Sequence, residues 1–368
     1  MSGRIRVAVV YGGRSSEHDV SLESAKCVLE NLDPERFDVL PIAIDREGVW
    51  HAQDLQALQA SRGKALPVDA AGAEVALASV SSGTVLQGAG QAAPVDVVFP
   101  VLHGPLCEDG SIQGLFELAQ VAYVGSGVLG SAICMDKDVA KRLVSAAGID
   151  TAEYVCVRAG QWPALAAALE ARVRDELGYP VFVKPANLGS SVGVTRVQEP
   201  AGLSAAVAYA LQYDEKVIVE RAVDAREIEL AVLSSLDEGA PPDVSVAGEI
   251  VPKGGFYDYE SKYLDPDGAA LHVPAQLTPE QSAEAQRIAQ QAFTLLECDG
   301  MARIDLFLDR KRQKLLFNEV NTIPGFTTIS MYPKLWEASG IPYRQLLARL
   351  IDLAVKRGAR RKRLERGR

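Results

Sequence analysis

Several features that would indicate other classes of protein are missing from this sequence. It has no apolar run of about 18 residues, the length that a membrane-spanning helix needs. Its net charge is −10, from 48 acidic and 38 basic residues, which argues against a nucleic-acid-binding protein. The apolar run near the N-terminus is too short for a secretory signal peptide. We therefore expect a cytoplasmic protein that binds neither nucleic acid nor membrane.

The usual signatures of zinc and common nucleotide sites are absent as well. No Cys-x-x-Cys pair occurs, and the cysteines are widely spaced, which argues against a zinc site and against a disulfide framework. The phosphate-loop signature GxxxxGK[ST] is missing, and no GxGxxG sequence opens a helix. The five cysteines are Cys27, Cys107, Cys134, Cys156 and Cys298.

The order of apolar segments predicts an α/β protein. The length of 368 residues corresponds to two or three domains. Residues 5–11, 37–44 and 95–102 have the composition of buried strands, and helical patterns follow over 22–32 and 112–119. Strands that alternate with helices predict a parallel sheet covered on both faces. We assign residues 1–130 to a first α/β domain, in which the segment 51–93 is an elaboration without recognisable chemistry.

Two further domains are predicted. Residues 131–224 begin with a helix around Met135 and continue with a helix near 162–177, strands at 181–184 and 216–221, and a glycine-serine loop at 186–193. Residues 225–368 contain four strands, near 227–234, 244–251, 301–308 and 314–320. Thr278, Pro279 and Gln281 predict the capped start of a helix over 279–297. The polar, glycine-rich segment 252–270 has no periodicity, and we expect it to be a closing loop over a binding site.

The strongest chemical pattern is a predicted β-hairpin near the C-terminus. Arg303 and Asp305 lie two residues apart in one strand, and a short polar turn joins it to the next. Glu319 and Asn321 are spaced in the same way, so each pair shares one face of its strand. Folding the hairpin places Asp305 opposite Glu319 to within about one residue of register. Oxygen ligands of this kind suit Mg²⁺, and the guanidinium can stabilise a transferred phosphoryl group. A salt-bridge ladder on a surface hairpin fits the same residues.

Two loops have the composition of anion-binding segments. Lys184 ends a buried strand and is followed by the glycine-serine loop, whose N–H groups could close over phosphates. After Asn321, the segment TIPGFTTIS leads into a predicted helix near 329–339, and Gly325 allows the backbone to approach a ligand closely. Either loop could equally be a structural turn.

Four further polar residues lie at the ends of predicted strands. Glu17 and His103 follow strands of the first domain, at the edge where open α/β sheets bind ligands. A carboxylate there could hold a substrate ammonium. Glu220 ends one strand and Glu227 begins the next. Solvated strand ends, or a histidine bonded to a turn, would explain the same positions.

Taken together, eight segments resemble the D-alanine–D-alanine ligase family. They occur in the family's order and span most of the chain. The resemblance implies an ATP-grasp fold of three α/β domains, with ATP between the central and C-terminal domains. It implies an ATP-dependent ligase that joins two D-alanine molecules through a D-alanyl phosphate, releasing ADP and phosphate, for peptidoglycan precursor synthesis. The segments are GGRSSEHDVS (12–21), LHGPLCEDGSIQG (102–114), YVGSG (123–127), MDK (135–137), VKPANLGSSVGV (183–194), YDYESKY (257–263), RIDLFL (303–308) and NEVNTIPGFT (318–327).

The resemblance also implies roles for individual residues. Positions that contact ATP in the family correspond to Lys137, Lys184, Glu220, Glu227, Lys262 and Asn318. Ligands of two Mg²⁺ or Mn²⁺ ions correspond to Asp305, Glu319 and Asn321. Glu17 corresponds to the carboxylate that holds the ammonium of the first D-alanine, with His103 near it. Ser190 and Tyr263 correspond to partners that connect the glycine loop to Glu17. Arg303 and the Gly325 N–H correspond to the group that stabilises the tetrahedral intermediate, and Ser330 and Met331 to the site of the second D-alanine.

The chain departs from the family pattern at two positions. Cys107 stands in LHGPLCEDG where the family has glycine, which could alter the loop or add a thiol near the site. Met331 follows Ser330 where leucine is common. The resemblance further implies a homodimer.

Three alternative functions remain. Ester-forming D-alanine–D-lactate ligases replace the loop tyrosine with histidine, so Tyr263 favours amide formation. Another ATP-grasp ligase could act on different amino acids, since Glu17 and Ser330 indicate a small zwitterion without fixing its handedness. A nucleotide-binding regulator without activity would be expected to lack Arg303 or some metal ligands, and all are present.

Overall fold

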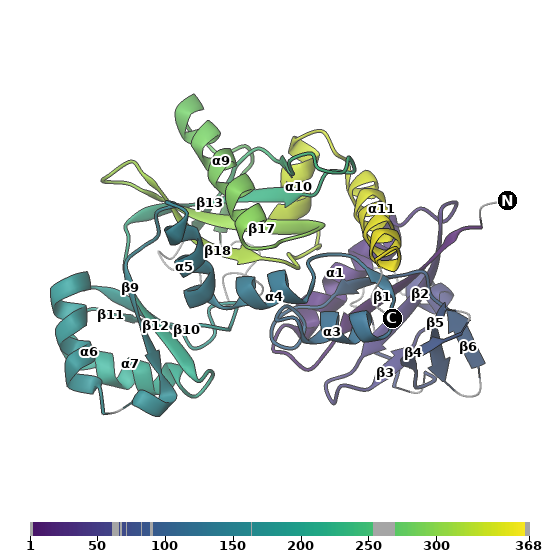
Figure 1. Ribbon diagram of the computed structural model, residues 1–368, viewed down its shortest axis with the longest axis horizontal. Helices are drawn as coiled ribbons and strands as arrows, with labels where there is room; N and C mark the ends of the chain where they lie inside the picture. The colour runs from purple at the N-terminus through teal and green to yellow at the C-terminus, as the bar shows by residue number, and fades with distance from the viewer. Residues whose placement is uncertain are drawn as a thin grey trace.

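The computed structural model describes residues 3–60, 66, 68–70, 72–81, 83–88, 91–162, 164–252 and 269–364. These residues form three large sheets and one small sheet, with helices packed against them (Figure 1). The third sheet lies between the other two large sheets in this view, and helix α11 extends from it over the first sheet (Figure 1). The mixed α/β class predicted from the sequence is confirmed.

The first large sheet has the order β3-β2-β1-β7-β8. Its neighbours pair in parallel, except that the edge strand β3 is antiparallel to β2. Helix α1 packs on one face and α3 on the other, as expected for a parallel sheet. The bounds are β1 (Ile5–Gly12), α1 (His18–Asn31), β2 (Phe37–Ile44), β3 (Trp50–Ala52), β7 (Val97–Val101), α3 (Ser111–Leu118) and β8 (Ala122–Tyr123).

The segment predicted to be an elaboration of the first domain forms a small antiparallel sheet of its own. Its order is β4-β5-β6, and Leu86 of the middle strand packs into the same core as Phe116 of α3. The bounds are α2 (Leu55–Ala60), β4 (Ala76–Val80), β5 (Gly83–Gly88) and β6 (Gln91–Pro94).

The second large sheet is antiparallel, with the order β11-β10-β12-β9. Two helices close a separate apolar core against it. The helix predicted near 162–177 begins later, at Ala166. It is a regular α-helix over Ala166–Arg172, and its last turn, Val173–Leu177, is π-helical. The bounds are β9 (Tyr154–Arg158), α6 (Ala166–Arg172), β10 (Val181–Pro185), β11 (Thr195–Val197), α7 (Leu203–Ala210) and β12 (Lys216–Arg221).

Two short helices, rather than one, lead into this sheet. Helix α4 (Val128–Met135) ends at Met135, and α5 (Lys137–Ala146) begins at Lys137. Asp136 separates them because its backbone is extended and its carboxylate accepts the Val139 N–H at 3.1 Å, which caps α5. The cap fixes where the first residue of α5 lies.

The third large sheet is antiparallel, with the order β16-β15-β13-β17-β18, and β14 pairs with β13. The predicted capping box at Thr278 and Gln281 is confirmed at the start of α9. The bounds are β13 (Ala225–Leu233), β14 (Asp243–Val244), β15 (Gly248–Pro252), β16 (Ala269–His272), α9 (Pro279–Leu295), β17 (Met301–Asp309), β18 (Leu315–Asn321), α10 (Met331–Ala338) and α11 (Tyr343–Lys362).

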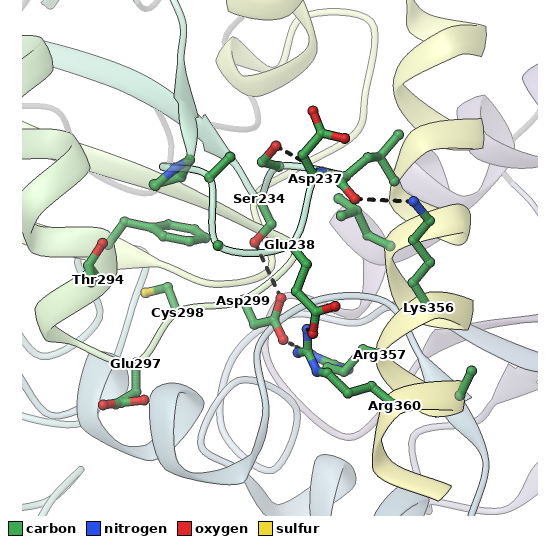
Figure 2. Close-up of a pocket in the computed structure, with 18 of the residues that line it drawn as sticks. Ser234, Asp237, Glu238, Thr294, Glu297, Cys298, Asp299, Lys356, Arg357 and Arg360 are labelled. Atoms are coloured by element: carbon green, nitrogen blue, oxygen red, sulfur yellow. Dashed lines mark hydrogen bonds and ion pairs between the residues drawn. The ribbon is translucent and has the colours of Figure 1, made fainter. Parts of the chain in front are cut away.

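Helix α11 ties the end of the chain to the first sheet. Its Arg357 donates to the carbonyl of Tyr123 at 2.6 Å, and the guanidinium lies 4.4 Å from the centre of that ring. Next to this contact, the loop 234–242, the end of α9 and the outer end of α11 line an open pocket of about 710 Å³ (Figure 2).

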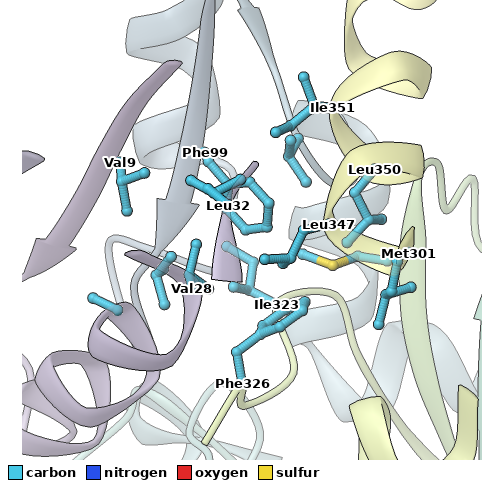
Figure 3. Packing of buried hydrophobic residues seen from close by; sticks show 14 of the residues in the cluster. Val9, Val28, Leu32, Phe99, Met301, Ile323, Phe326, Leu347, Leu350 and Ile351 are labelled. Atoms are coloured by element: carbon cyan, nitrogen blue, oxygen red, sulfur yellow. The ribbon is translucent and has the colours of Figure 1, made fainter. Parts of the chain in front are cut away.

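One apolar core spans the first and third units. Val9 and Phe99 of the first sheet pack with Leu347 and Ile351 of α11 (Figure 3). Phe326, from the loop before α10, packs edge-on against Phe99, with 5.8 Å between the ring centres. The loop after β18 is therefore held against the first sheet by a shared core.

Each of the three large sheets falls within one of the predicted ranges 1–130, 131–224 and 225–368, and the exact boundaries stay predictions. Among the described residues, no helix is long and apolar enough to cross a membrane.

Candidate functional site

The predicted hairpin forms with the predicted register. Asp305 of β17 pairs with Glu319 of β18, and Arg303 pairs with Asn321. A β-bulge between Asp305 and Leu306 shifts the register beyond this point, so that Leu306 pairs with Phe317. The bulge leaves the polar groups of both strands together at one end of the hairpin.

Arg303 is held in place by two carboxylates. Its Nε and Nη2 donate to the two oxygens of Asp305, each at 2.7 Å, and its Nε lies 3.1 Å from Glu229 of β13. Burial alone would lower the pKa of Arg303, but Asp305 and Glu229 raise it well above its usual range. Glu229 pairs directly with Asp305, so Glu229, Asp305 and Glu319 form a row across three strands. The guanidinium is a permanent cation beside a row of carboxylates.

The donor set of this row is suited to a hard divalent cation. Asp305 and Glu319 supply carboxylate oxygens, and Asn321 supplies an amide whose Nδ2 donates to Asp305 Oδ2 at 3.0 Å. The Oδ1 of Asn318 in the same strand is buried without a hydrogen-bond partner among the described residues. No three His, Cys, Asp or Glu side chains in the described part of the chain are gathered into a metal site. A cation here would therefore need water and ligand oxygens to complete its shell.

A buried carboxylate joins two lysines in the second sheet. Glu220 of β12 lies 2.7 Å from Lys184 of β10 and 2.7 Å from Lys141 of α5. Burial alone would raise the pKa of Glu220, but Lys141 and Lys184 lower it to about 2. The Lys141 side chain is completely buried. The arrangement leaves one positive charge in excess at the edge of the glycine-serine loop.

Lys137 connects the glycine-serine loop to the hairpin. As the first residue of α5, its backbone N–H donates to the Ala186 carbonyl at 3.0 Å. Its ammonium donates to the Leu188 carbonyl at 2.6 Å and lies 3.6 Å from Glu319. The second and third sheets therefore meet at this lysine.

Ser190 connects the same loop to the first sheet. Its hydroxyl donates to the Glu17 carboxylate at the start of α1. Ser190 and Ser191 have φ values of 52° and 59°, in the left-handed region that residues other than glycine rarely adopt. Strain of this kind is concentrated at functional sites. The loop conformation brings the hydroxyl of Ser190 to the carboxylate.

The backbone around Glu17 leaves room for its carboxylate. A Cβ at Gly104 would lie 2.8 Å from Glu17 Oε2, and Gly104 has a φ of 81°. Glu108 accepts the Gly104 N–H at 2.7 Å. Burial, together with the nearby charge of Glu17, raises the pKa of Glu108 to about 8. Two carboxyl groups therefore share this region.

His103 connects the first sheet to the loop after β18. Its Nδ1 lies 3.1 Å from the Ile323 carbonyl, and its Nε2 lies 3.5 Å from the hydroxyl of Ser24 in α1. That hydroxyl also accepts the Phe326 N–H at 3.2 Å. Burial lowers the pKa of His103, an effect that Glu17 partly opposes.

The loop after β18 positions the hydroxyl of Ser330. Ser330, at the N-terminus of α10, accepts the Thr327 N–H at 3.0 Å. A Cβ at Gly325 would lie 2.7 Å from the Ser330 hydroxyl oxygen, so a side chain at 325 would displace this hydroxyl. The side chain of Met331 is buried in the core shared with α11, which leaves its backbone as the part available to a ligand.

Comparisons with known proteins identify the family of the chain. The model of the D-ala D-ala ligase N-terminus matches residues 6–126, and that of the C-terminus matches residues 143–352. A D-alanine–D-alanine ligase A from Bradyrhizobium diazoefficiens is 50% identical, over 100% of this chain and 99% of the relative. The chain belongs to the D-alanine–D-alanine ligase family.

Solved structures of related ligases have the same fold. The D-alanine–D-alanine ligase of Coxiella burnetii superimposes with a TM-score of 0.85 at 34% identity, covering 99% of this chain and 97% of that one. The VanG D-Ala:D-Ser ligase of Enterococcus faecalis gives a TM-score of 0.83 at 36% identity, covering 96% and 100%. The predicted ATP-grasp fold, the family and the enzyme class of an ADP-forming ligase are confirmed.

Some predicted site residues are not connected to this network by the contacts described above. Glu227 lies half-buried in β13, two residues before Glu229 and on the same face. Lys262 and Tyr263 lie outside the described residues, as does most of the predicted closing loop 252–270. The side chain of Cys107 is buried in the core with Phe116, and burial raises its pKa to about 12, with smaller contributions from Glu108, Asp109 and Glu17.

Four residues of this ligase's candidate site were not identified from the sequence: Lys141, Glu229, Gly104 and Glu108. Lys141 lies one helical turn after Lys137, and this spacing was a signal that could have been used. The roles of Glu229 and Glu108 depend on contacts with residues that are distant in the sequence.

Proposed function

We propose that this site uses ATP to join two molecules of D-alanine into D-alanyl-D-alanine for peptidoglycan precursor synthesis, and that ATP binds between the second and third sheets. One connected set of contacts carries the proposal. Lys137 joins the glycine-serine loop to Glu319, and Ser190 joins the same loop to Glu17. Groups suited to phosphates, to a metal ion and to a substrate ammonium therefore adjoin one loop.

At the nucleotide end, lysines and backbone N–H groups hold the phosphates. Lys137 and Lys184 supply ammonium groups beside the loop, and ATP would compete for them with Glu319 and Glu220. Glu220, Glu227 and Asn318 contact the nucleotide in this proposal, and the unpartnered Oδ1 of Asn318 supports a ligand at that position.

Asp305, Glu319 and Asn321 would hold Mg²⁺ or Mn²⁺, which neutralises charge on the phosphates when it is bound. The amide of Asn321 has to turn over to present its oxygen, because its nitrogen now donates to Asp305. Three oxygen donors on one face support this assignment.

The first D-alanine is oriented by Glu17. The carboxylate of Glu17 pairs with the substrate ammonium. Ser190 holds the glycine-serine loop against Glu17, and His103 holds the loop after β18 next to the first sheet. The substrate carboxylate then attacks the γ-phosphorus of ATP, forming D-alanyl phosphate and ADP. Lys262 and Tyr263 of the closing loop would cover this intermediate and exclude water.

The second D-alanine is held at the loop after β18. Ser330 and the backbone of Met331 receive its carboxylate, and its amine attacks the acyl carbon. Arg303 and the Gly325 N–H stabilise the oxyanion of the tetrahedral intermediate, which then expels phosphate. Two carboxylates fix the position of Arg303, so the donor needs no reorganisation during the reaction.

A D-alanine–D-serine ligase is the nearest alternative, because VanG is a D-Ala:D-Ser ligase with a similar fold. Family resemblance alone supports a homodimer and a cytoplasmic location. Size-exclusion chromatography with light scattering tests the dimer: a mass of one chain at micromolar concentration would exclude it.

The experiment is ATP-dependent phosphate release with D-alanine, L-alanine, D-serine or D-lactate, alone and paired with D-alanine, followed by mass determination of the products. We expect release with D-alanine alone and formation of the dipeptide. Mixed products formed in preference to D-alanyl-D-alanine would move the assignment to a D-serine or D-lactate ligase. Phosphate release that needs none of these acceptors would overturn the proposal.

A further inference from the structure

Two cysteines that are distant in the sequence contact each other. The sulfur of Cys134, in α4, lies 3.4 Å from the sulfur of Cys298, in the turn after α9. Cys134 is buried and Cys298 is half-buried. All five cysteines are free and lie in the described part of the chain. No step of the proposed reaction uses this pair.

The close approach of these sulfurs is built into the backbone. A Cβ at Gly130 of α4 would lie 2.2 Å from the carbonyl oxygen of Glu297, so the helix packs directly on the turn. Glu297 has a φ of 56°, and the Cys298 N–H donates to the Phe293 carbonyl at 3.0 Å, which fixes the turn. Cys134 follows Gly130 by one helical turn and therefore lies on the same face of α4. The side chains of Cys134 and Cys298 are in contact because the backbone of α4 packs directly on the turn after α9.

Only one of the two thiols is open to a small molecule in solution. Cys298 lines the open pocket of about 710 Å³ that the loop 234–242 and α11 complete (Figure 2). Cys134 is 4% exposed. The hydrogen bond to Cys298, followed by burial, raises the pKa of Cys134 well above its usual range, so this group stays a thiol. An oxidant would therefore meet Cys298 first.

We propose that Cys134 and Cys298 are a modification site, at which hydrogen peroxide forms a reversible disulfide. The Cys298 sulfur attacks one peroxide oxygen, the O–O bond breaks, and a sulfenic acid and water result. The Cys134 sulfur then displaces hydroxide from the sulfenic sulfur, and the thiol proton leaves with it as a second water. The two thiols are oxidised by two electrons, and one peroxide is reduced.

The bond would link two segments that carry residues of the proposed active site. Cys134 lies three residues before Lys137, and Cys298 lies five residues before Arg303. The sulfurs have to move from 3.4 Å to about 2.05 Å, so one segment shifts toward the other. Lys137 lies 3.6 Å from Glu319, and a displacement of about 1 Å there is large enough to slow catalysis. This effect on activity rests on the proposed function, whereas the bond itself does not.

The first experiment detects the bond directly. The full-length protein is treated with hydrogen peroxide, alkylated, digested without reductant and analysed by mass spectrometry. We expect a cross-linked Cys134–Cys298 peptide in the wild type and in the control Cys156→Ser, which changes a half-buried thiol elsewhere. The peptide should be absent from Cys134→Ser and Cys298→Ser. If Cys134→Ser impairs folding because Cys134 is buried, Cys298→Ser alone decides the test. Alkylation of both thiols in the peroxide-treated wild type, or sulfinic acid at Cys298 without the cross-link, would overturn the proposal.

The second experiment measures how oxidation changes the rate of phosphate release. Oxidised wild type should lose about half or more of its D-alanine-dependent phosphate release, because Lys137 is displaced, and should recover it with dithiothreitol. Cys298→Ser should keep its rate after peroxide. A cross-link without any change in rate would overturn the regulatory effect. Absence of ligase activity before oxidation would contradict the proposed function instead, and leave the cross-link measurement intact.

Discussion

Gly325 lies so close to Ser330 that a Cβ at position 325 would stand 2.7 Å from the Ser330 hydroxyl oxygen. The same hydroxyl accepts the Thr327 N–H at 3.0 Å, so it has little freedom to move away. The missing side chain therefore protects the group that we propose for the carboxylate of the second D-alanine.

Gly325→Ala should raise the KM for the second D-alanine by roughly tenfold or more, because displacing Ser330 weakens a hydrogen bond to a charged group. Initial rates over a range of D-alanine concentrations measure this change. The KM for ATP should change much less. Gly114→Ala is the matched control, because a Cβ at Gly114 in α3 would meet nothing within 4 Å. Equal effects of the two substitutions would contradict the role of this contact.

Arg303→Lys should lower kcat by about 10² to 10³, because lysine keeps the charge but cannot bridge Asp305 and Glu229 as the guanidinium does. The contacts at stake are the paired 2.7 Å hydrogen bonds to Asp305 and the 3.1 Å approach to Glu229. Arg312→Lys, on the exposed turn of the same hairpin, should leave kcat unchanged. A normal kcat in Arg303→Lys would contradict the proposed role of Arg303 in stabilising the oxyanion.

Lys141→Met should lower the melting temperature strongly, because it leaves the buried Glu220 with one cation instead of two. Leaving a buried charge without any partner costs about 3–5 kcal/mol, and Lys184 should offset part of this loss. The double variant Lys141→Met with Glu220→Gln should be less destabilised, because no buried carboxylate is then left short of a cation. Differential scanning calorimetry of these proteins tests this, with the exposed Lys311→Met as control. A double variant no more stable than Lys141→Met would contradict the account.

Stability should also depend on Glu220 at acidic pH. Its pKa of about 2 is below the usual value of about 4.3, so the folded state binds the proton more weakly than the unfolded state. The stabilisation is complete above the usual value and is lost as the pH falls from there toward 2. The melting temperature of Glu220→Gln should approach that of the wild type over this interval, and a constant difference would rule out this linkage.

Glu108→Gln should make the folded state more stable, by an amount that grows with pH. The pKa of Glu108 is raised to about 8, so below the usual value of about 4.3 the carboxyl group is protonated in both states and adds no penalty. Between these values the wild type must bind a proton on folding and loses stability as the pH rises. The difference in melting temperature should grow up to about pH 8 and then level off. The exposed Glu35→Gln should show no such growth, and a flat difference for Glu108→Gln would be inconsistent with a raised pKa.

The hairpin at 301–321 could be predicted from the sequence because its information is local. Side chains alternate along each strand, and the short turn allows few registers, so the pairing of Asp305 with Glu319 followed. The bulge after Asp305 did not follow, since no local residue requires it. Glu229 was missed because β13 and β17 are far apart in the sequence, and only their pairing brings Glu229 beside Arg303.

Helical positions were harder to interpret. A lysine on an amphipathic helix is normally solvated. Lys141 is buried because α5, which packs against β18 of the third sheet, brings it to Glu220 of the second sheet. The same reasoning applies to Cys134 and Cys298, whose contact depends on the packing of α4 against the turn after α9. The roles of most residues came from the family resemblance rather than from the geometry that the sequence alone predicts.

The central claim is that ATP activates the carboxylate of one D-alanine as an acyl phosphate before the second D-alanine attacks it. The most direct measurement uses D-alanine labelled with ¹⁸O in its carboxylate, with mass analysis of the phosphate and the dipeptide. The attacking oxygen stays with phosphorus when the amine displaces phosphate, so each phosphate released should carry one ¹⁸O for each dipeptide formed. Unlabelled phosphate released alongside the dipeptide would contradict the acyl phosphate and, with it, the mechanism.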